Sequence, residues 1–286
     1  MCGLAGYYSK EPIPRESLQA MTEALTHRGP DAKGYFYDQD IAFGLGHQRL
    51  SILDLSEAAN QPMHSHSKRY VIVYNGEVYN YRELASSLPI ALKTHCDTEV
   101  LLEGFVHEGP SFVTKLNGMF AYVIFDKLEK RLHLFRDRIG IKPLYFYESQ
   151  GIFAFASELK SLTANRWLRE RLTLNKEAIN TYLHLGYVPE PLTIYNEVHK
   201  FPSGHSAVLE PNMDLKLNSY WSIDEALATP PSENGRNAKQ QLKKLLLDSV
   251  EKRLLSDVPL GTFLSGGIDS SLVTALAAEV SSEPVK

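Results

Sequence analysis

Cysteine is scarce in this chain, which has 286 residues and only two cysteines, Cys2 and Cys96. Two thiols cannot form the disulfide framework of a small secreted domain. Long apolar runs are also missing, because no stretch approaches the ~18 residues that span a bilayer. The opening residues, MCGLAGYYSKEP, lack the basic start and the long apolar segment of a signal peptide. These absences predict a cytoplasmic protein with both thiols reduced.

The chain also lacks a large excess of charge of one sign. The formal net charge is −4, and the densest basic cluster, residues 239–244, follows an amphipathic helical pattern. The chain therefore lacks the electrostatic footprint of a protein that binds nucleic acid or an anionic membrane. His64 and His66 alternate in a polar segment without a nearby cysteine or paired carboxylates, so we expect no metal site there.

What is present is an ordinary globular composition, with 43% hydrophobic and 22% charged residues. The length suits two domains, or one domain and part of another. The pattern predicts a buried strand at 2–8 and helices at 15–26 and 98–107. Four short strands follow, at 119–125, 132–136, 144–147 and 152–156. Successive strands with few helices between them indicate antiparallel sheets and an α+β fold.

The character of the chain changes in its last third. TPPSENG at 229–235 is a linker candidate, followed by a helix at 238–255, an apolar strand at 258–264 and a helix at 270–280. This order is typical of a parallel α/β sheet. We predict a first domain at 1–216, and at 217–286 a linker with the truncated start of a second domain.

Cys2 is the first candidate for chemistry. Removal of Met1, which a small second residue permits, would make Cys2 the N-terminus. Its α-amine, with a pKa of about 7.7–8.0, could then accept the thiol proton. On position alone, a small buried residue of an edge strand is the commoner alternative.

Asn75 and Gly76 have two interpretations. Asn-Gly favours a type I′ hairpin turn, but an asparagine side chain and a glycine N–H can also form an oxyanion hole. Glu77 and Asp97 could bind the ammonium of an amino acid, and Arg49 its carboxylate. Each of these is more often a surface charge, and Asp97 could be the N-cap of the helix at 98.

The chain resembles a known family through several ordered motifs. MCGLAGYY, HRGPD (27–31), HQRLSILD, YNGEVYNYREL and CDTEVLL resemble the glutaminase domain of class II glutamine amidotransferases. RDRIGIKPLYF (136–146) and FASELKSL (155–162) narrow the resemblance to the asparagine synthetase branch. The resemblance covers nearly the whole chain and implies an N-terminal-nucleophile αββα sandwich.

The resemblance also implies roles for residues. Cys2 would attack the carboxamide of glutamine, while Asn75 and the Gly76 N–H stabilise the oxyanion. No cofactor is implied for this half, and residues 27–31 would form a loop beside the nucleophile. The implied glutamine-binding residues, with Ser51 and Ile52 acting through their backbone, are Arg49, Ser51, Ile52, Asn75, Gly76, Glu77 and Asp97.

A second site is expected at LSGGIDSS (264–271), between the predicted strand and helix. Its glycines let backbone amides converge on an anion, and a helix N-terminus adds partial positive charge. It is not a Walker A loop, and a plain Gly-rich turn is the alternative. It resembles the PP-loop of ATP pyrophosphatases. The implied ATP-binding residues are Leu264, Ser265, Gly266, Gly267, Ile268, Asp269, Ser270 and Ser271.

Together these features predict a glutamine-hydrolysing asparagine synthetase that binds glutamine, ATP with Mg²⁺, and aspartate. In that family, ATP converts aspartate to aspartyl-AMP, which ammonia then attacks. Two alternatives stay open: an amidotransferase for another carboxylate acceptor, and a module that only binds or hydrolyses glutamine. Cys2 argues against the related β-lactam synthetases, because they do not keep the nucleophilic cysteine. The sequence leaves the oligomeric state open, a homodimer included.

Overall fold

The computed structural model describes residues 1–228, 237–281 and 284–286. The chain divides into two compact units, Met1–Ser51 with Ser56–Ser222, and Ile52–Leu55 with Ile223–Lys286. The linker predicted at 229–235 lies outside the described residues. The domain boundary after residue 216 stays a prediction, and the compact units divide six residues later, after Ser222.

The first unit contains two six-stranded sheets, in which all neighbouring strands are antiparallel. The first, here called sheet A, has the order β10 (Val198–Lys200), β8 (Tyr145–Ser149), β9 (Ile152–Ala156), β1 (Gly3–Ser9), β3 (Ala42–Arg49) and β2 (Ala32–Tyr37). The second, sheet B, has the order β12 (Leu215–Ser219), β11 (His205–Leu209), β7 (Arg131–Arg136), β6 (Gly118–Asp126), β5 (Tyr70–Val78) and β4 (Met63–His64).

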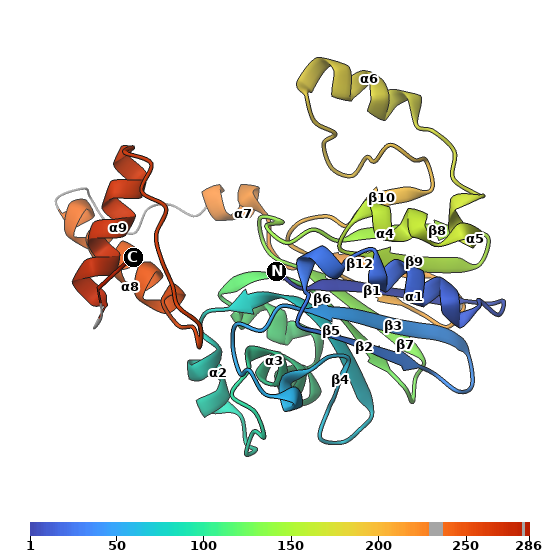
Figure 1. Cartoon of the computed structure of the whole chain (residues 1–286), viewed down its shortest axis with the longest axis horizontal. Coiled ribbons are helices and arrows are strands. Elements are labelled where there is room, and N and C mark those ends of the chain that lie inside the picture. Colours follow the sequence, from blue (N-terminus) through green and yellow to red (C-terminus); the bar gives the residue numbers. More distant parts are fainter. Residues whose placement is uncertain (229–236, 282–283) are drawn as a thin grey trace. The chain divides into compact units, whose positions relative to one another are not determined.

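Helices cover the outer faces of both sheets (Figure 1). On sheet A, α1 (Arg15–Glu23) packs on β1 and β3, and α4 (Leu159–Ala164) packs on β9. On sheet B, α3 (Asp97–Glu108) packs on β5, with α2 (Tyr81–Ser87) beside it. The α+β class and the αββα sandwich are therefore confirmed. The unit also contains α5 (Arg166–Arg169), α6 (Lys176–Leu185), and the 3₁₀ turns Thr26–Arg28, Glu57–Ala59 and Gly109–Lys115.

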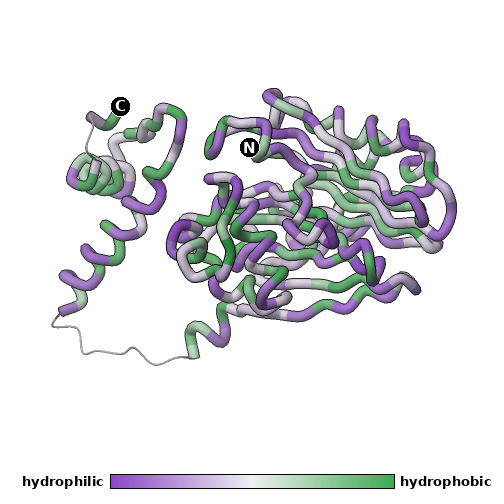
Figure 2. Tube along the Cα trace, turned by 90° about the horizontal axis from the view of Figure 1, so that it is seen from below, coloured by the Kyte–Doolittle hydropathy of each residue, from purple (hydrophilic) through white to green (hydrophobic). Residues whose placement is uncertain are grey.

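The sequence of β1 explains why this strand is central. Leu4 and Tyr8 point into the core between the sheets, whereas Ala5 and Tyr7 pack in the layer that contains Leu18 of α1. Side chains alternate across a strand, so a strand covered on both faces must be apolar throughout. Figure 2 shows the mixture of apolar and polar residues along the strands of the two sheets.

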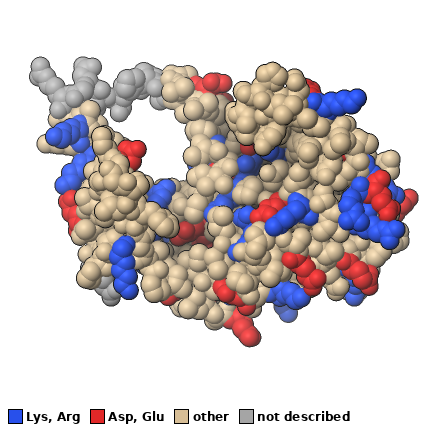
Figure 3. Space-filling view, turned by 45° about the horizontal axis from the view of Figure 1, so that its top comes forward, with Lys and Arg blue, Asp and Glu red and all other residues tan. Residues whose placement is uncertain are grey.

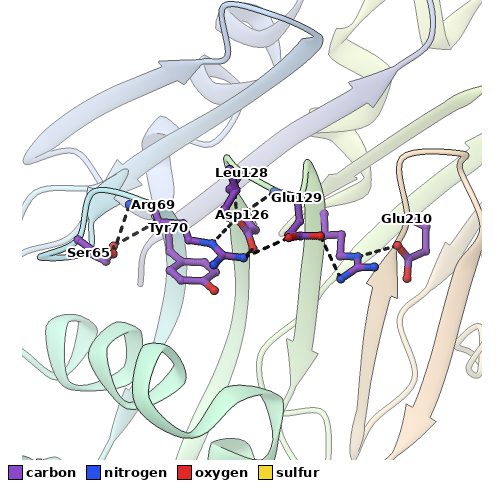
Figure 4. Close-up of polar contacts among 9 residues, drawn as sticks. Ser65, Arg69, Tyr70, Asp126, Leu128, Glu129 and Glu210 are labelled. Carbon is purple, nitrogen blue, oxygen red and sulfur yellow. Dashed lines mark hydrogen bonds and ion pairs between the residues drawn. The ribbon is translucent and has the colours of Figure 1, made fainter.

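Charges on the surface are mixed in sign. On the face drawn in Figure 3, Lys and Arg lie among Asp and Glu. At one end of sheet B these charges form a chain of ion pairs (Figure 4). Arg69 donates to both carboxylate oxygens of Asp126, at 2.9 and 2.6 Å, and Arg131 donates to Glu210 at 2.7 Å. Glu129 lies 3.8 Å from Arg69 and 3.6 Å from Arg131. These ion pairs therefore connect the ends of β5, β6, β7 and β11.

One local prediction needs correction. The hairpin alternative for Asn75-Gly76 is wrong, because both residues lie inside β5 and pair with Ala121 and Phe120 of β6. Neither residue has the positive φ that a type I′ turn needs, since pairing with a long neighbouring strand overrides the local turn preference. The four strands predicted at 119–156 exist, but β6 and β7 belong to sheet B while β8 and β9 belong to sheet A.

The second unit contains α7 (Ile223–Ala228), α8 (Ala238–Arg253) and α9 (Ile268–Val280). The strand predicted at 258–264 is wrong: the described residues of this unit form helices and loops only. A strand requires a neighbouring strand for its N–H and C=O groups. Among the described residues no strand lies beside this segment, although the Thr262 N–H donates to the Lys286 carbonyl at 2.8 Å. Within the described residues of the whole chain, no helix is long and apolar enough to cross a membrane.

Candidate active site

Cys2 directly precedes β1, which lies between β9 and β3 in sheet A. The edge-strand alternative is therefore wrong, since β1 is a central strand. The Leu50 N–H donates to the Cys2 Sγ at 3.4 Å, and the same sulfur lies 3.7 Å from the Leu50 carbonyl oxygen. The thiol is thus held against the backbone at the end of β3.

Burial raises the pKa of the Cys2 thiol, although the Leu50 N–H and the Arg49 guanidinium both favour the thiolate. The thiol therefore needs a base at neutral pH. Burial lowers the pKa of the neighbouring α-amine, which belongs to Met1 in this structure. A terminal amine at this place is neutral over a wider pH range than an exposed one.

The HRGPD segment holds the nucleophile on one side. Arg28 Nε donates to the Cys2 carbonyl oxygen at 2.9 Å, and its NH1 donates to Glu158 at 2.8 Å. Burial alone would raise the pKa of Glu158, but hydrogen bonds from Arg28, His27 and Lys160 lower it to about 2. Glu158 is thus an ionised anchor for the arginine that fixes the Cys2 backbone.

The same segment also holds the end of β3. The Asp31 N–H donates to the Arg49 carbonyl at 3.0 Å, and the Asp31 carboxylate accepts from the Ser51 N–H at 2.8 Å. A Cβ at Gly29 would lie 2.4 Å from the Gln48 carbonyl oxygen, so only glycine allows this approach. Residues 27–31 therefore lie beside both Cys2 and the backbone of residues 48–51.

Asn75 has a polar group without a partner. It is 1% exposed, and its Nδ2 has no hydrogen-bond partner among the described residues. A buried amide donor left unpaired costs free energy, which is typical of a site completed by a ligand. His47, opposite Leu4 of β1, lies with its Nε2 at 2.9 Å from the Tyr74 carbonyl oxygen. The start of β1 and residues 74–76 of β5 therefore lie across from each other between the sheets.

The direction of the Gly76 N–H follows from its neighbours in β5. Phe120 lies opposite Gly76 in β6, and both of its backbone groups bond away from β5: its N–H donates to the Asp137 carboxylate, and its carbonyl accepts from the Asp137 N–H. Tyr74 and Val78 donate their N–H groups to side chains at the free edge of β5. Alternate residues of a strand point their N–H groups the same way, so Gly76 directs its N–H to that edge too. A Cβ there would lie 2.4 Å from the Met119 carbonyl oxygen.

Asp97 is buried and tied to the same strand. Its carboxylate accepts from the Tyr74 hydroxyl at 2.7 Å and the Val78 N–H at 3.0 Å. Burial raises the pKa of Asp97, while these two hydrogen bonds oppose the rise. The N-cap alternative is wrong, because Cys96 is the N-cap and Asp97 is the first helical residue. The charge of Asp97 acts on the Cys2 thiol, where it opposes formation of the thiolate.

Of the remaining predicted glutamine-binding residues, Arg49 and Glu77 belong to the first compact unit and Ile52 to the second. Arg49 is buried, and its NH1 donates to the Ser56 carbonyl at 2.8 Å and to Asn60 at 2.7 Å. Glu77 is half-buried in β5, and its charge acts on Tyr74 and on Lys142. Ile52 belongs to the second compact unit, where its carbonyl accepts from the Asp257 N–H at 3.1 Å.

Sequence reasoning assigned no role to two residues that the structure brings to the site. Glu158 anchors Arg28, and Lys142 is buried with its Nζ 3.1 Å from the Met1 Sδ. Both lie inside the motifs RDRIGIKPLYF and FASELKSL, which served only to carry a resemblance. A lysine with apolar residues on both sides, in IGIKPLYF, is the signal that could have singled out Lys142.

Residues 264–267 precede α9, residues 268–271 are the first four residues of that helix, and most of this segment is exposed. Gly266 has φ +84°, and a Cβ there would meet nothing within 4 Å. The Ser265 and Ser270 hydroxyls lie 3.0 Å apart, and Gly267 is the N-cap of α9. The loop thus presents hydroxyls and a helix N-terminus to open space, as an anion site requires.

Comparisons with known proteins identify the family of the chain. Residues 1–221 match the family model described as glutamine amidotransferase domain, and residues 241–286 match asparagine synthase. The chain is 37% identical over 287 residues to asparagine synthetase [glutamine-hydrolyzing] 1 of Bacillus subtilis, covering 98% of this chain and 44% of the relative. It is 31% identical over 307 residues to the amidase chry2 of Gibberella zeae, covering 100% of this chain and 44% of the relative.

The chain spans about half the length of the curated relatives it matches. Among solved structures, it resembles glutamine phosphoribosylpyrophosphate amidotransferase of B. subtilis, at 16% identity and a TM-score of 0.57, over 98% of this chain and 64% of that one. That likeness concerns the fold. The family match covers most of the chain, and the chain therefore belongs to the glutamine amidotransferase domain family.

Proposed function

We propose that Cys2, as the processed N-terminus, hydrolyses glutamine and supplies ammonia for the ATP-dependent amidation of aspartate. The observation that carries the glutaminase half is the buried, unpartnered Nδ2 of Asn75 beside the outward N–H of Gly76. Two donors at the edge of β5 suit an oxyanion that forms only during the reaction.

The chemistry follows from the groups around Cys2. The terminal amine accepts the thiol proton, and Sγ forms a bond with the carboxamide carbon of glutamine. The oxyanion accepts hydrogen bonds from Asn75 Nδ2 and the Gly76 N–H. The C–N bond then breaks, the nitrogen takes the proton from the amine, and ammonia leaves. Water hydrolyses the thioester, which releases glutamate and restores the thiol.

Recognition of glutamine needs groups of both signs. Asp97 and Glu77 would receive the α-ammonium, and Arg49 the carboxylate, with the Ser51 and Ile52 backbone completing the set. Burial disfavours the charged form of Asp97, so a substrate ammonium would stabilise that carboxylate. Binding of glutamine and ionisation of Asp97 would thus support each other.

The synthetase half rests on residues 241–286 and the loop before α9. Ser265, Ser270, Ser271 and the Gly266-Gly267 amides would hold ATP phosphate oxygens. Among the described residues, no group of three or more His, Cys, Asp or Glu could hold a metal ion. Mg²⁺ would therefore arrive with the nucleotide, whose phosphates supply ligands. Aspartyl-AMP formation and attack by ammonia are part of this proposal.

A second acceptor class is a specific alternative. The similarity to the amidase chry2 at 31% identity is not far below the similarity to asparagine synthetases. An amidotransferase that uses another carboxylate would keep the same glutaminase site. Release of asparagine from aspartate, ATP and glutamine by a protein completed with its synthetase domain would distinguish the two.

The test of the glutaminase half is alkylation by 6-diazo-5-oxo-norleucine, a glutamine analogue, followed by intact mass and peptide mapping. We expect a mass without Met1 and a single adduct on Cys2. Cys2→Ala should lose the adduct and at least about a thousandfold of glutamine hydrolysis. Cys96→Ala is the matched control and should keep both. Clean removal of Met1 without an adduct would contradict the proposal and favour a binding module.

A further inference from the structure

The strand that carries Asn75 loses one of its two neighbours at Tyr74. Pairing between β4 and β5 stops at Met63, which lies opposite Ile72. From Tyr74 onward, β5 pairs with β6 on one side, and among the described residues no strand lies on its other side. Tyr74 is only 3% exposed. Buried backbone groups need hydrogen-bond partners, so the outward N–H and C=O of Tyr74 require groups other than a strand.

Two side chains from distant segments take the place of that strand. The Tyr74 N–H donates to Gln61 Oε1 at 2.6 Å, and the Tyr74 carbonyl oxygen lies 2.9 Å from His47 Nε2. A carbonyl oxygen can only accept, so this ring nitrogen is the donor. Gln61 is 7% exposed and His47 is fully buried. Together they hold the peptide groups on both sides of Tyr74, and the second of these joins Tyr74 to Asn75.

Gln61 is itself held by two other elements. Its Nε2 donates to the Thr98 hydroxyl of α3 at 3.3 Å. A Cβ at Gly34 of β2 would lie 2.2 Å from the Gln61 carbonyl oxygen, so the backbone of Gln61 lies against sheet A. The preceding residue of α3, Asp97, accepts from the Tyr74 hydroxyl at 2.7 Å. Gln61 therefore connects β2, α3 and β5 at the point where β4 ends.

The position of the Asn75 amide depends on this backbone. Side chains alternate along a strand, so Asn75 points to the same face as Val73, which belongs to the core between the sheets. Because Asn75 Nδ2 has no partner among the described residues, the backbone that carries it sets its place. An oxyanion donor acts only from a fixed position, and a displacement of about 1 Å can cost a rate of about 100-fold.

We propose that Gln61 is a positioning residue for glutamine hydrolysis, which replaces the missing strand at Tyr74 and so holds the Asn75 donor where the oxyanion forms. The inference rests on the proposed function of Asn75. Gln61 acts through the backbone of β5 and does not contact the substrate. Its loss should therefore affect the transition state more than the binding of glutamine.

The experiment measures kcat for glutamine hydrolysis in the full chain, and glutamine binding by calorimetry in a Cys2→Ala background. Gln61→Met removes the acceptor at similar side-chain size and should lower kcat about 10- to 100-fold, with an unchanged dissociation constant. In an Asn75→Ala background the same change should cost less than about threefold, because the donor it positions is already gone. Gln19→Met, which changes an exposed glutamine of α1, is the matched control and should equal the wild type.

Failure of this inference and failure of the proposed function give different results. A folded Gln61→Met with the kcat of the wild type would overturn the inference alone, and so would an equal loss with and without Asn75→Ala. If Gln61→Met does not fold by circular dichroism, the isosteric Thr98→Val decides. A kcat lower by about fivefold with unchanged binding would support the inference, and a wild-type kcat would overturn it. A wild type that hydrolyses no glutamine would overturn both.

Discussion

The two compact units differ in what covers their apolar residues. In the first unit, side chains from both sheets form one core, which includes Leu45, Val73, Phe125 and Phe155, all fully buried. Among the described residues of the second, α8 and α9 bury a small group, Val250, Leu276 and Ala277. Phe263 is 99% exposed and Ile268 87% exposed.

The difference shows that an apolar pattern becomes a strand only where a neighbouring strand is present to pair with it. In the first unit, every strand has a neighbour in the same chain, so the pattern at 119–156 became four strands. In the second, no strand lies beside the apolar run at 258–264 among the described residues, and the run stays irregular. Burial, more than local preference, decided the outcome.

The largest expected effect tests whether glutamine hydrolysis depends on the first unit. Asn75→Ala should lower kcat for glutamine hydrolysis by about 100- to 1000-fold, because it removes an oxyanion donor. Binding of glutamine by calorimetry should change little. Asn218→Ala, on exposed β12, is the control and should retain full activity. Loss of binding with unchanged kcat would assign Asn75 to substrate recognition instead.

The second prediction compares equal truncations in the two units. Leu45→Ala removes a fully buried side chain between the sheets and should lower the free energy of unfolding by about 2–5 kcal/mol. Leu245→Ala removes one that is 67% exposed on α8 and should change it by less than about 0.5 kcal/mol. Urea unfolding followed by circular dichroism measures both. Similar costs would mean that Leu245 is covered in solution.

The third prediction uses the fact that all ten histidines lie in the first unit. Burial lowers the pKa of His47 from 6.5 to about 4. The unfolded chain therefore binds more protons between these values, and stability falls as the pH drops from 6.5 to 4. The loss from His47 should reach about 3 kcal/mol at most. His47→Gln should flatten this slope in urea titrations, and an unchanged slope would contradict the assignment.

Much of the fold could be predicted from the chain itself. The runs at 2–8, 15–26 and 98–107 correspond to β1, α1 and α3, because their apolar spacing matched faces that are in fact buried. The distribution of β6 to β9 over two sheets could not be predicted. It depends on the segment at 136–144, where Arg136 and Asp137 bind backbone groups from distant parts of the chain.

The amino-acid sequence by itself determined the family and the identity of the candidate groups, since the residue types and their order carry that information. Only the tertiary structure decided which groups act together. In it, Asn75 lies in β5 and not in a turn, Asp97 accepts a hydrogen bond from the Tyr74 hydroxyl, and the Lys142 Nζ contacts Met1. These are contacts between residues far apart in the chain, and they exist because two packed sheets bury polar groups that must then find partners in space.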